Sequence, residues 1–122
     1  MTEGILKILA DQGWKYSGKC SGCDFQVANT PMGEMIRFRV KSRLTINFKY
    51  LGYENLHIAF PVKQKNGTTD WYFTKHSDLV ETARRYTNWL ETKSWKLDGY
   101  YHTKSPSEKF LEKIRQYRLG NT

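Results

Sequence analysis

An aspartate and a lysine lie on neighbouring predicted strands, and together they have the chemistry to hydrolyse a phosphodiester bond. Asp24 lies in a strand predicted over residues 23–28, and Lys41 lies in a longer strand predicted over residues 35–44. At the open edge of a sheet, two such strands can present both side chains on one face. A carboxylate can hold Mg²⁺ or Mn²⁺, which polarises the phosphate and activates water. The lysine would orient that water or offset charge in the transition state.

The order of these residues resembles the PD-(D/E)xK nuclease superfamily. In that superfamily a helix with an acidic residue precedes a strand carrying Asp, and a strand carrying Glu/Gln-x-Lys follows. Here Glu3, Asp24 and Lys41 occur in that order, and the resemblance covers roughly residues 3–90. The strand with the lysine is similar to that of small prokaryotic and phage members. Its sequence is Phe38-Arg39-Val40-Lys41-Ser42-Arg43.

The resemblance implies a restriction-endonuclease-like fold, an α/β (α+β) architecture in which a mixed sheet is flanked by helices. It implies a metal-dependent DNA endonuclease with Asp24 as the metal ligand, Lys41 as the catalytic lysine and Glu3 assisting the metal or the water. The cofactor would be Mg²⁺ or Mn²⁺, required only for catalysis. Many members of the superfamily act as dimers that cut opposite strands, so the resemblance also implies a homodimer.

One residue departs from the pattern of the superfamily. Arg39 stands two positions before the lysine, where members have Glu, Asp or Gln. A guanidinium cannot bind Mg²⁺ and would repel it. Three outcomes stay open: Glu34 or another nearby carboxylate replaces the missing ligand, Asp24 and Glu3 hold one metal ion alone, or catalysis has been lost. In the last case the chain would be a catalytically inactive nucleic-acid-binding module.

Basic residues occupy alternate positions of the predicted strand over residues 35–44. Since side chains alternate between the faces of a strand, all of them should lie on one face, and Lys49 could extend the row. The whole chain has 122 residues, with 20 Lys+Arg against 12 Asp+Glu and a formal charge of +8. This excess favours a nucleic-acid partner. The alternatives are a solvated outer face of a sheet, or a protein-interaction domain whose charge is incidental. The basic residues of the strand are Arg37, Arg39, Lys41 and Arg43.

The predicted elements form a single domain over residues 1–122, since the chain has no repeat or Pro/Gly-rich linker and is short for two cores. Asn66-Gly67 predicts a type I′ hairpin between two strands. A capping box at residues 105–108 predicts the start of a last helix that Gly120 ends. The other predicted helices and strands cover residues 2–12, 14–16, 56–62, 70–74 and 77–90.

Cys20 and Cys23 have the spacing of half a zinc site. A closed structural site needs four ligands, so two of His57, His76 and His102 would have to complete it. The alternative is a pair of ordinary thiols that precede a strand.

The aromatic residues also allow two interpretations. Most of them, including Trp89, are expected in the core or at its edge. Tyr50, Tyr53 and Tyr100 lie among lysines, and such rings could instead stack on unpaired bases.

No apolar run approaches the roughly 20 residues that a membrane-spanning helix needs. The first residues lack the basic and apolar regions of a secretory signal. We therefore expect a cytoplasmic (intracellular) protein without a membrane span.

Overall fold

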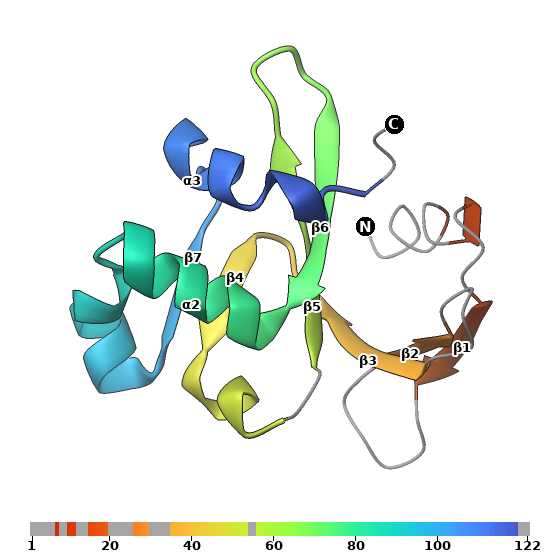
Figure 1. Cartoon of the computed structure of the whole chain (residues 1–122), viewed down its shortest axis with the longest axis horizontal. Coiled ribbons are helices and arrows are strands. Elements are labelled where there is room, and N and C mark those ends of the chain that lie inside the picture. The colour runs from red at the N-terminus through yellow and green to blue at the C-terminus, as the bar shows by residue number, and fades with distance from the viewer. Residues whose placement is uncertain are drawn as a thin grey trace.

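Five strands form the larger of two sheets, in the order β1-β2-β3-β5-β6 (Figure 1). The computed structural model describes residues 7, 10–11, 15–19, 26–29, 35–53 and 56–119. β3 and β5 run parallel, whereas the other neighbouring strands run antiparallel. The mixed sheet and the helices beside it confirm the predicted α+β class. The strands of this sheet are β1 (Lys15–Lys19), β2 (Gln26–Asn29), β3 (Met35–Val40), β5 (His57–Lys63) and β6 (Thr69–Lys75).

β5 and β6 form the predicted hairpin, with the Cα atoms of His57 and Lys75 paired at its open end. The turn is longer than the predicted two-residue type I′ turn. The N–H of Gly67 donates to the carbonyl of Gln64 at 3.0 Å, and the N–H of Gln64 donates to the carbonyl of Thr68 at 2.7 Å. Gly67 adopts a φ of 89°, which glycine reaches without steric cost. These contacts are typical of a three-residue hairpin loop with glycine in the left-handed position.

The predicted strand over residues 35–44 is divided between two sheets. β3 ends at Val40, the chain bends through residues 41–43, and β4 (Leu44–Asn47) then pairs antiparallel with β7 (Tyr100–Thr103). The prediction of one continuous strand is therefore wrong. The bend carries Leu44, which is fully buried, into a different hydrophobic cluster from that of β3.

Two α-helices, α2 (His76–Tyr86) and α3 (Glu108–Lys113), lie to one side of the β5–β6 hairpin, with β1 and β2 on the other side (Figure 1). Within the described ranges, no helix is long and apolar enough to cross a bilayer. Short 3₁₀ turns are η1 (Phe48–Gly52), η2 (Trp89–Glu91) and η4 (Arg115–Tyr117), and η3 (Ser94–Asp98) is a π-helical turn.

Both faces of the β5–β6 hairpin are covered by apolar side chains. On one face Ile58 and Phe60 pack with α2, α3 and β4, and on the other face Ala59 packs with β3. Residues 58–60 are therefore all fully buried, although strand neighbours point in opposite directions. The larger cluster is made by Leu44, Ile46, Tyr50, Leu56, Ile58, Phe60, Val62, Tyr72, Leu79, Val80, Ala83, Trp89, Phe110 and Ile114.

The two C-terminal helices are shorter than predicted. α2 buries Leu79 and Ala83, but it ends at Tyr86, whose side chain is 47% exposed, instead of continuing to residue 90. α3 begins after Ser107, whose Oγ accepts from the N–H of Phe110 at 3.1 Å. The predicted start at residues 105–108 is therefore displaced, because Ser107 rather than Ser105 is the N-cap.

Residues after η4 lie along the outer edge of β6. Arg118 forms an antiparallel bridge with Tyr72, and the N–H of Leu119 donates to the carbonyl of Trp71 at 2.8 Å. The guanidinium of Arg118 is also 3.3 Å from the carboxylate of Asp70. Part of the open edge of β6 is thereby occupied.

Candidate nucleic-acid interface

Three cationic side chains converge on the ring of Tyr50. The guanidinium carbon of Arg39 lies 5.6 Å from the ring centroid, and the Nζ atoms of Lys41 and Lys49 each lie 5.5 Å from it. No two of these charges can therefore be farther apart than about twice that distance. Because the Debye length is about 8 Å at physiological ionic strength, an anion bound here would be attracted by all three. We call Arg39, Lys41 and Lys49 the cation cluster.

The cation cluster is assembled by the bend between the two sheets. Arg39 belongs to β3, and Lys41 is the first residue after that strand. The backbone N–H of Lys41 donates to the carbonyl of Ala59 in β5 at 2.8 Å. Lys49 and Tyr50 belong to η1, which comes after β4. The chain thus leaves the larger sheet at Lys41, and η1 brings Lys49 and Tyr50 back beside Arg39 and Lys41, so residues on both sides of β4 become neighbours.

Buried contacts hold the Tyr50 ring in place. Tyr50 is 2% exposed, and its ring packs edge-on against that of His76 with the centroids 5.3 Å apart. The Nε2 atom of His76 accepts a hydrogen bond from the backbone N–H of Asn47 at 2.9 Å. The side chain of Asn47 in turn caps η1 by accepting from the N–H of Lys49 at 3.1 Å. One lysine of the cluster is therefore fixed through its backbone as well as by the ring.

His76 contributes no positive charge to this region at neutral pH. Burial lowers its pKa to about 4, well below the usual 6.5. Since Nε2 accepts the hydrogen bond from Asn47, the ring proton of the neutral form lies on Nδ1. Nδ1 is buried and has no hydrogen-bond partner among the described residues. His76 is therefore a neutral packing partner of Tyr50.

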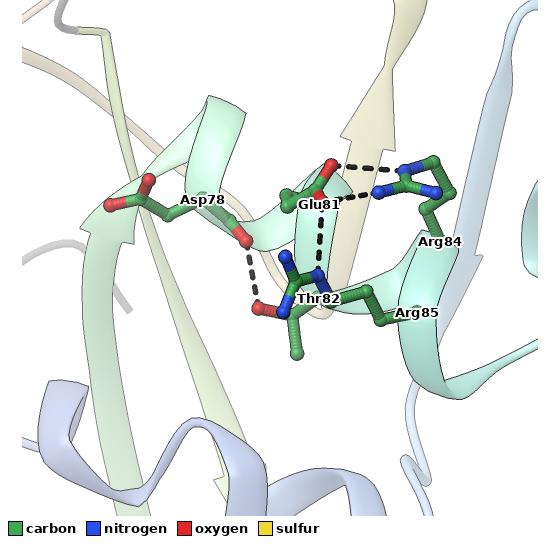
Figure 2. A network of polar contacts seen from close by, with 5 residues as sticks. All are labelled: Asp78, Glu81, Thr82, Arg84 and Arg85. Atoms are coloured by element: carbon green, nitrogen blue, oxygen red, sulfur yellow. Dashed lines mark hydrogen bonds and ion pairs between the residues drawn. The ribbon is translucent and has the colours of Figure 1, made fainter.

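The ion pairs between described residues do not involve Lys41 or Lys49. Figure 2 shows Glu81 on α2 accepting from Nε of Arg84 at 3.0 Å and from Nε of Arg85 at 3.1 Å, which lowers the pKa of Glu81 to about 2. The other ion pairs join Lys65 to Glu108, Lys96 to Glu91 and Arg118 to Asp70.

The structure brings together only part of the predicted basic row. Arg37 is exposed on β3 and alternates with the buried Ile36, as predicted. Arg43 lies beyond the strand, in the bend, where its Nη1 atom is 3.3 Å from Nδ1 of His102 on β7. The prediction that strand alternation aligns Arg43 with the other basic residues is wrong, because β3 ends before it. Lys49, the predicted extension, does join the cluster.

Of the predicted catalytic residues, only Lys41 lies within the described part of the chain. Glu3, Asp24 and Glu34 lie outside it, so their roles stay predictions. At the Tyr50 ring, the charged neighbours of Lys41 are Arg39 and Lys49, and cations supply no ligand for Mg²⁺ or Mn²⁺. Among the described residues, no group of three or more His, Cys, Asp or Glu side chains could hold a metal. The described surroundings of Lys41 therefore do not fit a divalent metal ion.

The histidines proposed as zinc ligands belong to separate elements. His57 on β5 stacks on Phe73 with ring centroids 5.1 Å apart. His76 on α2 accepts a hydrogen bond from the backbone of Asn47, and His102 on β7 lies against the side chain of Arg43. Cys20 and Cys23 lie outside the described residues. The zinc site therefore stays a hypothesis.

One aromatic residue proposed for base stacking is buried. Tyr50 has no ring face open to solvent, because it supports the cation cluster from beneath. Tyr53 is 46% exposed and Tyr100 is 38% exposed. Phe48, which the sequence did not single out, is 64% exposed. The signal in the sequence that could have identified Phe48 as a candidate is its position directly before Lys49.

Comparisons of the chain with protein-family models, curated proteins and solved structures gave no match.

Proposed function

We propose that this chain binds the phosphate backbone of nucleic acid, with DNA as the target, through Arg39, Lys41 and Lys49. The observation that carries the proposal is the convergence of these three cations on one tyrosine ring. Each phosphate neutralised by a lysine or arginine releases condensed counterions, which is the main sequence-independent source of affinity for DNA. The exposed Arg37 on the same strand could add a further contact.

The placement of the cluster supports binding over a merely solvated surface. Like charges at this separation repel one another. Cation–π contacts at exposed sites stabilise the arrangement by only about 0.5–1 kcal/mol each. Elsewhere on the described surface, lysines such as Lys65 and Lys96 are paired with a carboxylate, whereas Lys41 and Lys49 form no ion pair with a described residue. A polyanion would relieve the repulsion within the cluster. The chain thus keeps its concentrated positive charge at a site where an external anion can approach Lys49, which is exposed.

The second candidate is the metal-dependent endonuclease that the resemblance implies, with a restriction-endonuclease-like sheet. The mixed sheet and the position of Lys41 after β3 are in keeping with that proposal. Arg39 speaks against it, because its guanidinium meets the same ring as the Lys41 ammonium, where an acidic ligand would be required. Binding without cleavage is therefore the function that we favour.

Neutralising the cation cluster should reduce the salt dependence of DNA binding. With a fluorescent duplex titrated between 50 and 200 mM salt, the slope of log K against log [salt] should be shallower by about 2.7 in R39Q/K41Q/K49Q, at about 0.9 per phosphate. The same slope predicts that these contacts alone weaken wild-type binding about 40-fold over that range. The measurement is fluorescence anisotropy.

The matched control removes the same number of positive charges elsewhere, as K65Q/R84Q/R85Q. These side chains are exposed and ion-paired, so their loss should leave the slope nearly unchanged. An equal loss of affinity in both triple variants would show that only net charge matters. Wild-type binding without salt dependence would contradict the proposal directly.

Wild-type protein incubated with supercoiled, linear and branched DNA and either Mg²⁺ or Mn²⁺ should bind without cutting. The physical reason is that Arg39 repels a dication at the place where a ligand is needed. Gel electrophoresis of the products measures the outcome. Metal-dependent cleavage that is lost in both Asp24→Ala and Lys41→Ala would replace our proposal by the endonuclease. Cleavage that appears only in Arg39→Glu would identify the lost acidic ligand.

A further inference from the structure

An apolar groove adjoins the cation cluster. Its cavity volume is about 510 Å³, within the usual range for small-ligand sites. The most exposed of its apolar walls are Phe48, at 64%, and Leu97, at 78%. Phe48 directly precedes Lys49 of the cation cluster in η1, so one short turn carries a residue of the groove and a residue of the cluster. The lining consists of Phe48, Leu90, Trp95, Lys96, Leu97, Asp98 and Gly99.

Backbone contacts fix Phe48 at the mouth of this groove. Its N–H donates to the carbonyl of Gly99 at 2.6 Å, and its ring meets that of Trp95 edge-on with centroids 6.2 Å apart. Gly99 has a φ of 75°, a conformation that a side chain would strain, and a Cβ there would lie 3.5 Å from Cβ of Phe48. The large exposed ring is thus held by its neighbours, although it contributes little to the core.

We propose that this groove receives an unpaired base of the nucleic acid whose phosphates the cation cluster holds. The inference rests on the proposed function and names its substrate class: single-stranded or locally unpaired DNA. Every base has an apolar face that stacks on an aromatic side chain. When Lys49 holds a phosphate of a strand, a base flipped out of that strand needs an aromatic face nearby. Phe48, the residue before Lys49, provides one. The carboxylate of Asp98 in the lining provides an acceptor for an exocyclic amino group.

Charge and continuity favour a base over a second copy of this chain. Lys96 lines the groove and Lys49 follows its residue Phe48 in the chain, and a second copy would bring the same positive charges against these lysines. A nucleic-acid strand instead brings phosphates to the lysines and a base to the ring. Both parts of one nucleotide are therefore matched by adjacent residues of η1.

The test uses a duplex, the same duplex with one unpaired 2-aminopurine, and a single strand. Wild-type protein should bind the last two more tightly than the duplex and should quench the 2-aminopurine by stacking. Phe48→Ala should weaken binding to both about 5- to 150-fold while leaving the duplex affinity and its salt slope unchanged. The matched control is Tyr86→Ala, which removes another exposed ring with a lysine, Lys113, 4.6 Å from its centroid. This control should bind like wild type.

Three results would overturn the inference, and circular dichroism of each variant first establishes that it is folded. If Phe48→Ala binds unpaired DNA as wild type does, while the triple cluster variant is weakened, the groove is not a base site and the proposed function stands. If wild type binds none of the probes, the proposed function itself fails. If Phe48→Ala changes only the sedimentation coefficient, from dimer to monomer, a second copy covers the groove.

Discussion

Replacement of Trp89 by alanine is expected to lower the free energy of unfolding by about 3–5 kcal/mol, the usual cost of deleting a large buried aromatic side chain. Trp89 is 8% exposed in the turn after α2. Its ring stacks on Tyr101 of β7 with centroids 4.9 Å apart and lies 4.5 Å from that of Phe110 of α3. Each such pair contributes about 0.5–1.5 kcal/mol beyond the area it buries. Urea denaturation followed by circular dichroism measures the change.

Two further variants separate the aromatic contacts from general effects of substitution. Trp89→Phe keeps one ring between β7 and α3, so it should lose less stability than Trp89→Ala. Leu97→Ala removes a side chain that is 78% exposed and should change stability by no more than about 0.5 kcal/mol. A loss below about 1 kcal/mol in Trp89→Ala would contradict the packing described for the second sheet and α3.

Stability is also expected to fall as the pH is lowered from about 6.5 to 4, because of His76. Its pKa is about 4 in the folded protein and near 6.5 in the unfolded chain. Between these values the unfolded state binds more protons, so stability rises with pH and the contribution of His76 is complete above about 6.5. The two pKa values bound the loss at about 3 kcal/mol. Unfolding free energies measured by urea titration at several pH values test this.

His76→Gln is the control for the pH dependence. A glutamine does not titrate, and its amide oxygen can still accept the hydrogen bond from Asn47 that Nε2 accepts in the native protein. The variant should be less stable at pH 7 but should lose little further stability between pH 6.5 and 4.5. Glu81, whose pKa is about 2, changes charge only below this window. Parallel pH curves for wild type and variant would exclude His76 as the cause.

The elements that the sequence predicted best are those that local signals determine. Asn66-Gly67 lies between two apolar segments, and the hairpin of β5 and β6 follows from that short-range pattern. The apolar spacing of Leu79 and Ala83 likewise identifies the buried face of α2. In both elements the error concerns length: the turn has one residue more than predicted, and the helix ends earlier.

The division of residues 35–47 could not be predicted, because the apolar alternation is interrupted only at Ser42 and resumes in the same register after the bend. Phe38 and Leu44 are an even number of positions apart, so the pattern is that of one long strand. What separates β3 from β4 is the pairing of Leu44–Asn47 with Tyr100–Thr103, which are far apart in the chain. Non-local pairing leaves no trace in a short window of sequence.

The sequence predicted only part of the candidate site, because the rest also depends on non-local contacts. Arg39 and Lys41 lie together because they are two residues apart on an extended chain, which alternation alone gives. Lys49 reaches them only through the bend, β4 and η1, and the burial of Tyr50 depends on His76 from a helix much later in the chain. The position of Arg43 beside His102 depends on β7 in the same way.

The contact of Arg118 and Leu119 with β6 bears on how copies of this chain behave beside one another. An outer strand with unpaired backbone N–H and C=O groups is a template on which another molecule can add a strand, and aggregation begins at such places. Here the N–H of Leu119 already occupies the carbonyl of Trp71, and Arg118 lies against Tyr72. The chain therefore shields part of its own sheet from neighbouring molecules, which would matter most where the proposed binding to a long polyanion gathers many copies together.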